Sequence, residues 1–163
     1  LHLLDEDTVL YAIGNMYIIV NIITGEKKTF FGKDTAGIGS LAVHPNKWFF
    51  AVAEKGLLPN IYIYDYKDNN RLYRILWKGT ELAYSHIAFS KSGSKLASVG
   101  MAPDFTLTVW DWMSQKVVLK TKASSQEIYR VGFSDFSDGN LVTCGLGHIK
   151  FWKMASTFTG LKL

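Results

Sequence analysis

The sequence predicts an all-β fold built from repeated sheets, and three observations lead to this prediction. Similar segments recur about every 44 residues along the 163-residue chain. The apolar segments are short, roughly five to eight residues, and rich in Val, Ile, Phe, Tyr and Trp, as β-strands are. Turn-forming residues separate them, and no stretch shows sustained helical periodicity.

Three units of the chain align with one another segment by segment. Their clearest marker is an aromatic residue near the end of the third segment: 46 residues separate Tyr64 from Trp110, and 42 separate Trp110 from Trp152. A weaker unit precedes them, with Asn21 at the position that Asp65 holds 44 residues later. The aligned segments are 41–45, 48–52 and 61–65; 87–90, 95–100 and 107–111; and 131–134, 141–145 and 149–153.

The spacing predicts the type of repeat. A period near 44 residues matches the roughly 40–45 of WD-type repeats, in which each unit is one four-stranded blade of a β-propeller. Because propellers close with about four to eight blades, we expect a partial WD40-type β-propeller, about three and a half blades of a larger closed ring. Residues 1–163 then form part of one domain, with a partial blade over 1–32 and blades over 33–79, 80–123 and 124–163.

The segment 107–112 predicts a strand that is covered on both faces. Successive side chains of a strand point to opposite sides. Leu107 and Val109 therefore face one way, and Thr108, Trp110 and Trp112 face the other. Both sets are largely apolar, as expected for a blade that lies between two neighbouring blades.

The dipeptide Trp110-Asp111 resembles the signature of WD repeats. The resemblance implies a tetrad of hydrogen-bonding residues: a third-strand Trp, a second-strand Ser or Thr, a loop His and a turn Asp. Here the loop position holds Asp34, Thr80 and Ser124 in place of His. We therefore expect divergent repeats held mostly by apolar packing. The structural positions that carry over are Trp110 with Ser98, Trp152 with Thr143, the turn residue Asp104, and Asp65 and Asp111 at strand ends.

Composition favours a folded domain outside several functional classes. Hydrophobic residues make up 48% and charged residues 20% of the chain, away from the composition of disordered proteins. The formal net charge of +4 comes from dispersed lysines, so we predict no nucleic-acid binding. The longest apolar stretch is far shorter than the roughly 20 residues that cross a bilayer, so we predict no membrane span. The single cysteine, Cys144, excludes an internal disulfide and fits a reducing compartment such as cytoplasm.

The residue types that carry catalysis do not cluster in the sequence. The four histidines are 42, 42 and 62 residues apart, which does not predict a metal site. Cys144 lies in an apolar segment, where cysteine acts as a small hydrophobe. Neither glycine-bearing stretch, 32–39 or 145–147, has the pattern of a phosphate-binding loop. We therefore predict no enzymatic activity, no catalytic or metal-binding residues and no cofactor.

Some expected loops carry more apolar residues than a solvated turn needs. Exposed aromatic and Met residues are enriched in protein interfaces. The alternative is that these side chains pack beneath neighbouring loops. The candidate partner-binding residues are Leu57, Leu58, Met101, Phe105 and Trp112.

At finer detail, the chain resembles the axonemal WD-repeat proteins of the cilia- and flagella-associated family. The resemblance rests on the segments 105–112, 121–131, 147–154 and 158–163 and covers most of the chain from about residue 41. It implies a long protein of the cytoskeleton, in the axoneme of the cilium or flagellum, with WD propellers and a coiled-coil tail. Such a protein would be a scaffold that tethers an inner-arm dynein to the doublet microtubule with a sister ciliary WD-repeat protein, and would be needed for ciliary motility.

A second family shares part of this pattern. The phrase His148-Ile149-Lys150-Phe151-Trp152 is similar to one in the propellers of echinoderm microtubule-associated protein-like proteins. That resemblance implies direct binding to tubulin, whose acidic surface would suit a positively charged partner. The two interpretations stay open at this stage.

Overall fold

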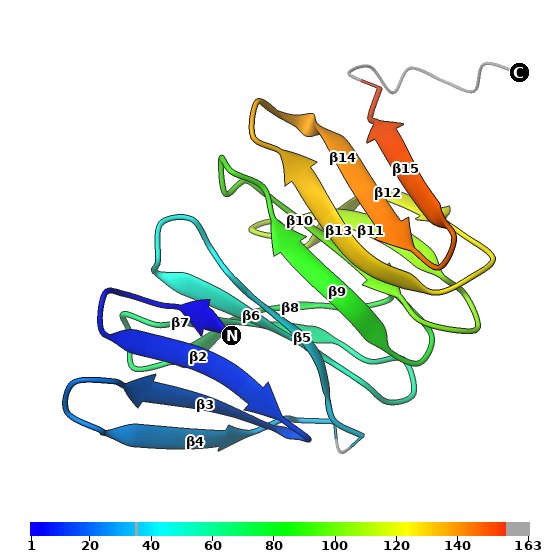
Figure 1. Cartoon of the computed structure of the whole chain (residues 1–163). Coiled ribbons are helices and arrows are strands. Elements are labelled where there is room, and N and C mark those ends of the chain that lie inside the picture. Colours follow the sequence, from blue (N-terminus) through cyan, green and yellow to red (C-terminus); the bar gives the residue numbers. More distant parts are fainter. Residues whose placement is uncertain (35, 156–163) are drawn as a thin grey trace, which may run out of the picture.

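The chain forms four antiparallel sheets that follow one another along the sequence. The structure is a computed structural model and describes residues 1–34 and 36–155. Figure 1 shows the sheets side by side, from the first sheet in blue to the fourth in orange. Their strands are β1 (His2–Leu3), β2 (Thr8–Ile13), β3 (Met16–Asn21) and β4 (Lys27–Phe31); β5 (Ile38–Val43), β6 (Phe49–Glu54), β7 (Ile61–Asp65) and β8 (Arg71–Leu76); β9 (Tyr84–Phe89), β10 (Lys95–Gly100), β11 (Thr106–Asp111) and β12 (Lys116–Lys122); and β13 (Ile128–Ser134), β14 (Ser137–Gly145) and β15 (His148–Lys153).

Within each sheet, strands that are adjacent in sequence pair with each other. Between sheets, β5 lies beside β9, and β9 lies beside β13. The first strands of successive sheets therefore adjoin, while the later strands fan outward (Figure 1). This is the arrangement of propeller blades around an axis, so the predicted all-β, WD-type fold is confirmed as part of a ring.

The first and last sheets differ in strand number from the sequence expectation. The segment before residue 33 was expected to hold only the latter part of a unit, yet it contains four strands. Its first strand, β1, is only two residues long, which is too short to give an alternating pattern in the sequence. The last sheet has three strands among the described residues. Residues 156–163, which include the end of the expected last blade, lie outside the described part.

The apolar core lies in the seams between sheets. One cluster joins the first and second sheets, a second joins the second and third, and a third joins the third and fourth. Strand β10 contributes to two of them: Leu96 packs toward the second sheet, whereas Ala97 and Val99 pack toward the fourth. The two-residue period of a strand explains this division, and it confirms that the third sheet is apolar on both faces.

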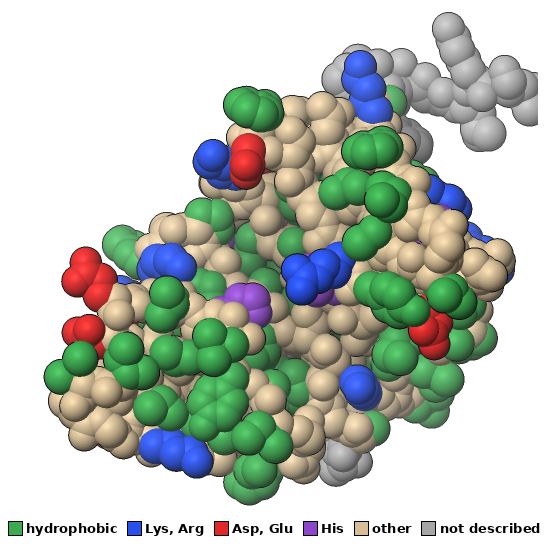
Figure 2. All heavy atoms as spheres, viewed as in Figure 1, with side chains coloured by type: hydrophobic (Ala, Val, Ile, Leu, Met, Phe, Trp, Pro, Cys, Tyr) green, Lys and Arg blue, Asp and Glu red, His purple; other side chains and the backbone are tan. Residues whose placement is uncertain are grey.

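The two outer sheets present apolar side chains to the outside of the described chain. Hydrophobic side chains gather over β2 to β4 and again over β14 and β15 in the space-filling view (Figure 2). Ile149 and Phe151 of β15 are exposed, although they occupy strand positions. Large exposed apolar patches mark surfaces that another part of a protein or a partner covers.

The residue that ends the third strand has the same role in three sheets. The Asp65 carboxylate accepts hydrogen bonds from the backbone N–H groups of Lys67 and Asp68, both at 3.0 Å. Asn21 caps the corresponding turn of the first sheet through its side-chain oxygen, and Asp111 accepts from the N–H of Ser114 at 3.2 Å. Asp and Asn favour such turns because their short side chains reach the backbone two or three residues on.

The two expected Trp–hydroxyl pairs behave differently. Trp152 donates from Nε1 to Thr143 Oγ1 at 2.9 Å, so this pair forms. Ser98 Oγ is buried and has no hydrogen-bond partner among the described residues, so the expected bond from Trp110 is absent. The strand register is equivalent in both sheets, since Leu96 lies opposite Trp110 and Leu141 opposite Trp152. Packing around Trp110, which is fully buried against the second sheet, takes the place of the hydrogen bond.

Candidate partner-binding surface

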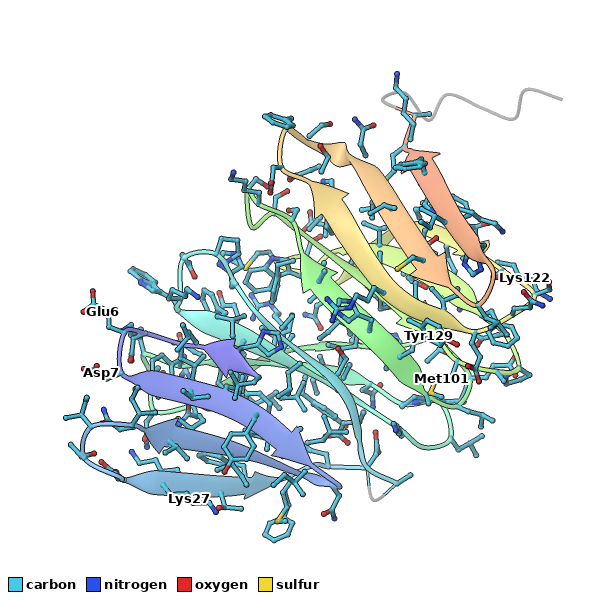
Figure 3. All side chains as sticks on the ribbon, viewed as in Figure 1. Glu6, Asp7, Lys27, Met101, Lys122 and Tyr129 are labelled. Carbon is cyan, nitrogen blue, oxygen red and sulfur yellow. The ribbon has the colours of Figure 1, made fainter. Side chains whose placement is uncertain are left out.

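The loops of the propeller segment form two rims. One rim contains the loops that follow the second strand of each sheet and the linkers that join one sheet to the next; we call it the linker rim. It includes residues 55–60, 77–83, 101–105, 123–127 and 146–147. The turns at the other ends of the strands form the turn rim. Met101, Lys122 and Tyr129 lie at the linker rim, and Glu6 and Asp7 lie at the turn rim (Figure 3).

One backbone hydrogen bond recurs along the linker rim. The N–H groups of Lys55, Met101 and Leu146 each donate at 2.8 Å to the linker that enters their own sheet. The acceptors are the carbonyl oxygens of Gly37, Ala83 and Glu127. The donors are 46 and 45 residues apart, so the sequence period reappears as a repeated contact at the rim. Each loop is thereby fixed to its neighbour.

Three loops at the centre of the rim are bonded together more extensively. Gly56 donates its N–H to Leu82 at 2.8 Å, and Leu58 donates to Glu81 at 2.7 Å. The hydroxyl of Thr80 donates to the Asp104 carboxylate at 2.8 Å, and so joins the linker to the next loop. Thr80 occupies the loop position at which WD repeats have a His. The Thr80–Asp104 hydrogen bond therefore takes the place of the contact that the loop His makes in the tetrad.

The central loops carry exposed leucine side chains. Leu57 is 83% exposed and Leu58 62% exposed, and Leu82 and Met101 are also exposed. Leu82 was not among the residues singled out from the sequence, because its closeness to Leu58 depends on the bonds between loops. Leu58 has a φ of 51°, a left-handed conformation that is uncommon for residues other than glycine and that stores strain. The alternative, that these leucines pack beneath neighbouring loops, is wrong.

Two of the expected partner-binding residues direct their side chains toward the core. Phe105 is half-buried and packs against the core between the third and fourth sheets. Trp112 is 2% exposed, so its assignment to a binding surface is wrong. Its indole Nε1 donates to the carbonyl of Gly93 at 2.6 Å, and its ring packs against His44 in the seam with the second sheet. The chain does emerge after Asp111, but the side chain of Trp112 turns inward.

Charged residues lie on both rims. The linker rim carries Lys55, Lys78, Lys120, Lys122 and Lys150, with Glu81 and Glu127 as its exposed acids. The amines of Lys120 and Lys150 reach backbone oxygens of neighbouring linkers at 2.6 Å, which holds these charges against the rim. The turn rim mixes both signs: its exposed acids include Glu6, Asp7, Glu26, Asp68 and Asp135, and its exposed bases include Lys27, Lys28, Lys67, Lys91 and Lys116.

A buried carboxylate beneath the linker rim has a structural role. Glu54 is fully buried and accepts hydrogen bonds from the backbone N–H groups of Lys33, at 2.7 Å, and Asp34. Burial raises the pKa of Glu54, while these N–H groups oppose the rise. Sequence reasoning missed this contact, because 21 residues separate Glu54 from Lys33. The carboxylate anchors the linker between the first and second sheets.

The described histidines and acids do not form a metal-binding group. Across 1–34 and 36–155, no group of three or more His, Cys, Asp or Glu side chains is placed to hold a metal ion. His44 is engaged with Gly93 through Nε2 at 3.0 Å, and burial together with Arg130 lowers the pKa of His86. Nor do these residues include a helix with the length and apolar character that crossing a membrane requires.

Comparison with known proteins places the chain in a family. No protein-family model matches the chain. The chain is 47% identical over 163 residues to cilia- and flagella-associated protein 44 of Mus musculus, which covers 100% of the chain and 9% of the mouse protein. The Chlamydomonas reinhardtii protein of the same name is 46% identical over 168 residues, covering 99% of the chain and 10% of that protein. The chain belongs to the cilia- and flagella-associated protein 44 family. As a member of this family, it is a partial chain that spans about a tenth of the length of these relatives, and it is a WD-repeat protein of the cilium or flagellum.

More distant similarities agree with the fold. Echinoderm microtubule-associated protein-like 1 of Homo sapiens is 29% identical over 164 residues, covering 94% of the chain and 20% of that protein. A chain in the crystal structure of the mitotic checkpoint complex superposes with a TM-score of 0.77 at 21% identity, covering 91% of the present chain and 45% of the matched one. At this identity the second similarity supports the WD40 propeller fold alone.

Proposed function

We propose that the chain is part of a non-catalytic scaffold of the axoneme, a propeller surface that links inner-arm dynein to the doublet microtubule and is needed for motility. Its partners in this role are a sister ciliary WD-repeat protein and the inner-arm dynein. Tubulin is a third candidate partner. The observation that carries the proposal is the 46–47% identity to cilia- and flagella-associated proteins along the whole chain.

The linker rim supports a binding role without catalysis. Its leucine side chains are exposed on loops that backbone hydrogen bonds hold in place. A preformed surface loses little conformational freedom when a partner binds, which favours affinity. Enzymatic sites need converging nucleophiles, acids or metal ligands, whereas the exposed side chains of this rim include the apolar residues Leu57, Leu58 and Leu82.

The proposal is tested by recovering the intact protein from axonemes with its partners. A tagged copy of the intact protein is isolated from demembranated axonemes, and the recovered proteins are identified by mass spectrometry. We expect inner-arm dynein heavy chains and a second ciliary WD-repeat protein to be enriched over a tag-only control. Recovery of neither would contradict the tether role.

Direct attachment to tubulin is the alternative function. It is favoured by the 29% identity to an echinoderm microtubule-associated protein-like protein and by the net charge of +4. Co-sedimentation of the purified intact protein with microtubules at increasing salt distinguishes the two functions. Strong sedimentation that falls steeply with salt supports direct attachment, since salt screens exposed charges. Weak sedimentation together with dynein recovery supports the tether.

A further inference from the structure

The exposed apolar residues of the central linker rim form one surface. Backbone hydrogen bonds place Leu58 beside Glu81 and Gly56 beside Leu82. Met101 is bonded to Ala83, the residue after Leu82. The side chains of Leu57, Leu58, Leu82 and Met101, all exposed, therefore come from three loops that touch one another. Contiguous apolar surface of this kind marks interaction sites more often than scattered single residues do.

The backbone is strained at Leu58 and at the end of an adjoining loop. Leu58 adopts a φ of 51°, and Phe105, at the end of the adjoining loop, adopts 46°. Such conformations persist only where the surroundings enforce them, and they cluster at ligand-binding and switch regions. Here the enforcing contacts are the bonds from Leu58 to Glu81 and from Phe105 to Met101. A loop selected for stability alone would favour glycine or asparagine at these positions.

Charge indicates the chemistry of the partner. Lys55 and Lys78 lie in the same loops as the exposed leucines, and Lys122 lies at the end of β12 on the same rim. The carboxylate of Asp104 is already bonded to Thr80. Glu6, Asp7 and Lys27 lie at the opposite ends of the strands, where acids and lysines are mixed (Figure 3). Around the apolar surface the three lysines outnumber the two acids, Glu81 and Asp104, and an excess of positive charge attracts an acidic partner.

We infer that the linker rim of this chain, centred on Leu57, Leu58, Leu82 and Met101, binds an acidic protein segment that packs apolar side chains against the three loops. The inference rests on the proposed scaffold function and specifies the surface and the chemistry of one of its partners. The leucines supply the buried contact, and the lysines around them orient the acidic segment and speed its association.

Site-specific photo-crosslinking in axonemes tests this inference. A benzophenone amino acid replaces Leu82 on the linker rim of the intact protein, or Ile23 on the turn rim, where the side chain is 73% exposed. We expect position 82 to crosslink to a protein segment with net negative charge and Leu, Ile, Phe or Met residues. Position 23 is expected not to crosslink to that segment. Mass spectrometry of the adducts identifies the attached peptide and its charge.

Matched double variants separate the apolar from the charged contribution. Leu57→Ser with Leu58→Ser, or Lys78→Glu with Lys122→Glu, is expected to lower the yield of the adduct at position 82 at least tenfold. Ile22→Ser with Ile23→Ser, and Lys27→Glu with Lys28→Glu, are the turn-rim controls and are expected to leave it unchanged. Hydrogen exchange of β6 and β10 in each variant verifies folding.

Each other outcome overturns the inference. An adduct at position 82 to a basic or uncharged segment contradicts the proposed chemistry, and an absent adduct contradicts the surface. An equal loss of the adduct at position 82 in the turn-rim controls would show that binding does not depend on the linker rim in particular. If dynein is still recovered while any of these results is obtained, the scaffold function stands and only this inference fails. If the acidic segment is crosslinked but neither dynein nor the sister protein is recovered, the inference stands without the tether.

Discussion

The hydroxyl of Thr80 donates a hydrogen bond to the carboxylate of Asp104 at 2.8 Å, and so ties the linker before the third sheet to the loop between β10 and β11. Thr80 is buried, and the same loop is bonded to the linker through Met101 and Ala83. A side chain and a backbone contact therefore fix the same two loops. This junction lies directly beneath the exposed leucines of the linker rim.

Replacing Thr80 by Val is expected to loosen this junction. Val has nearly the shape of Thr but offers no hydroxyl, so the Asp104 carboxylate loses a charge-assisted hydrogen bond worth about 1.5–3 kcal/mol. Hydrogen exchange of the intact protein should show faster opening in peptides covering 78–83 and 101–105. Thr80→Ser keeps the hydroxyl and serves as the control. Equal protection in both variants would show that the backbone bonds alone hold the loops.

Replacing Trp112 by Ala is expected to destabilise the seam between the second and third sheets. Removing a fully buried Trp costs about 3–5 kcal/mol, because it leaves a cavity and loses apolar contact. Here the ring also packs against Phe49 and Phe89, and its N–H bond to Gly93 would be lost. Opening free energies from hydrogen exchange of β10 and β11 measure the effect.

Trp48 provides a control of the same residue type. Its side chain is 57% exposed on the turn rim. Surface substitutions away from special features change stability by only about 0.5 kcal/mol. Trp48→Ala should therefore leave the opening free energies nearly unchanged. Similar effects from both variants would argue against the buried position of Trp112.

Trp112 also shows which part of the structure the sequence could predict. The repeated sheets, the alternation along β11 and the position of Asp65 at a strand end all depend on neighbours along the chain, and they were predicted. The direction of the Trp112 side chain depends on His44 and Phe49 of another sheet. The position of Trp112 just after Asp111 predicted an exposed side chain. The side chain is instead buried in the apolar seam between the second and third sheets.

The candidate site was predictable only in pieces. Leu57, Leu58 and Met101 stood out because apolar residues are unusual in turns. Their union into one surface with Leu82 depends on hydrogen bonds between residues 18 or more positions apart, such as Met101 with Ala83 and Leu58 with Glu81. The sequence also could not predict that Thr143 forms a hydrogen bond with its Trp whereas Ser98 does not. The two residues have equivalent strand registers, yet the bond forms in one sheet and not in the other.

Gly39 of β5 is expected to tolerate no side chain. A Cβ there would overlap the backbone carbonyl of Tyr84 in β9, where the innermost strands of the second and third sheets meet. Because backbone cannot move aside as a flexible side chain can, Gly39→Ala should force the sheets apart at a cost of about 1–3 kcal/mol. Thermal unfolding of the intact protein measures the loss of stability, and hydrogen exchange of β5 and β9 locates it.

Gly132 of β13 is the matched control for Gly39. It also lies in the first strand of its sheet, but the nearest atom to an added Cβ is Val142 Cγ1 at 4.0 Å. Gly132→Ala is therefore expected to be neutral, or stabilising by about 0.4–1 kcal/mol, because alanine restricts the unfolded chain. Destabilisation of equal size at both positions would mean that close approach of the sheets is not the cause.

Acid is expected to weaken the seam between the third and fourth sheets through Asp138. The carboxylate accepts hydrogen bonds from Ser94 at 2.9 Å, from Ser90 at 3.1 Å and from Ser92. Partial burial tends to raise its pKa, but these three hydroxyl groups outweigh burial and lower it. Because the folded-state pKa lies below the unfolded value of about 3.9, the ionised form is favoured by folding. Its contribution to stability is present above that pH and is lost as the pH falls through the folded-state pKa.

Hydrogen exchange of peptides covering 90–95 and 135–139, corrected for the intrinsic effect of pH, should therefore show a loss of protection as the pH falls below about 4. Asp138→Asn removes the titrating group, so its protection should be lower at neutral pH and should change less with acid. Asp135→Asn alters an exposed neighbour that only approaches Lys91 at 4.0 Å, and it should keep the response of the unaltered protein. A response that persists in Asp138→Asn would assign the acid sensitivity to another group, because the three serine hydroxyls donate to no other carboxylate among the described residues.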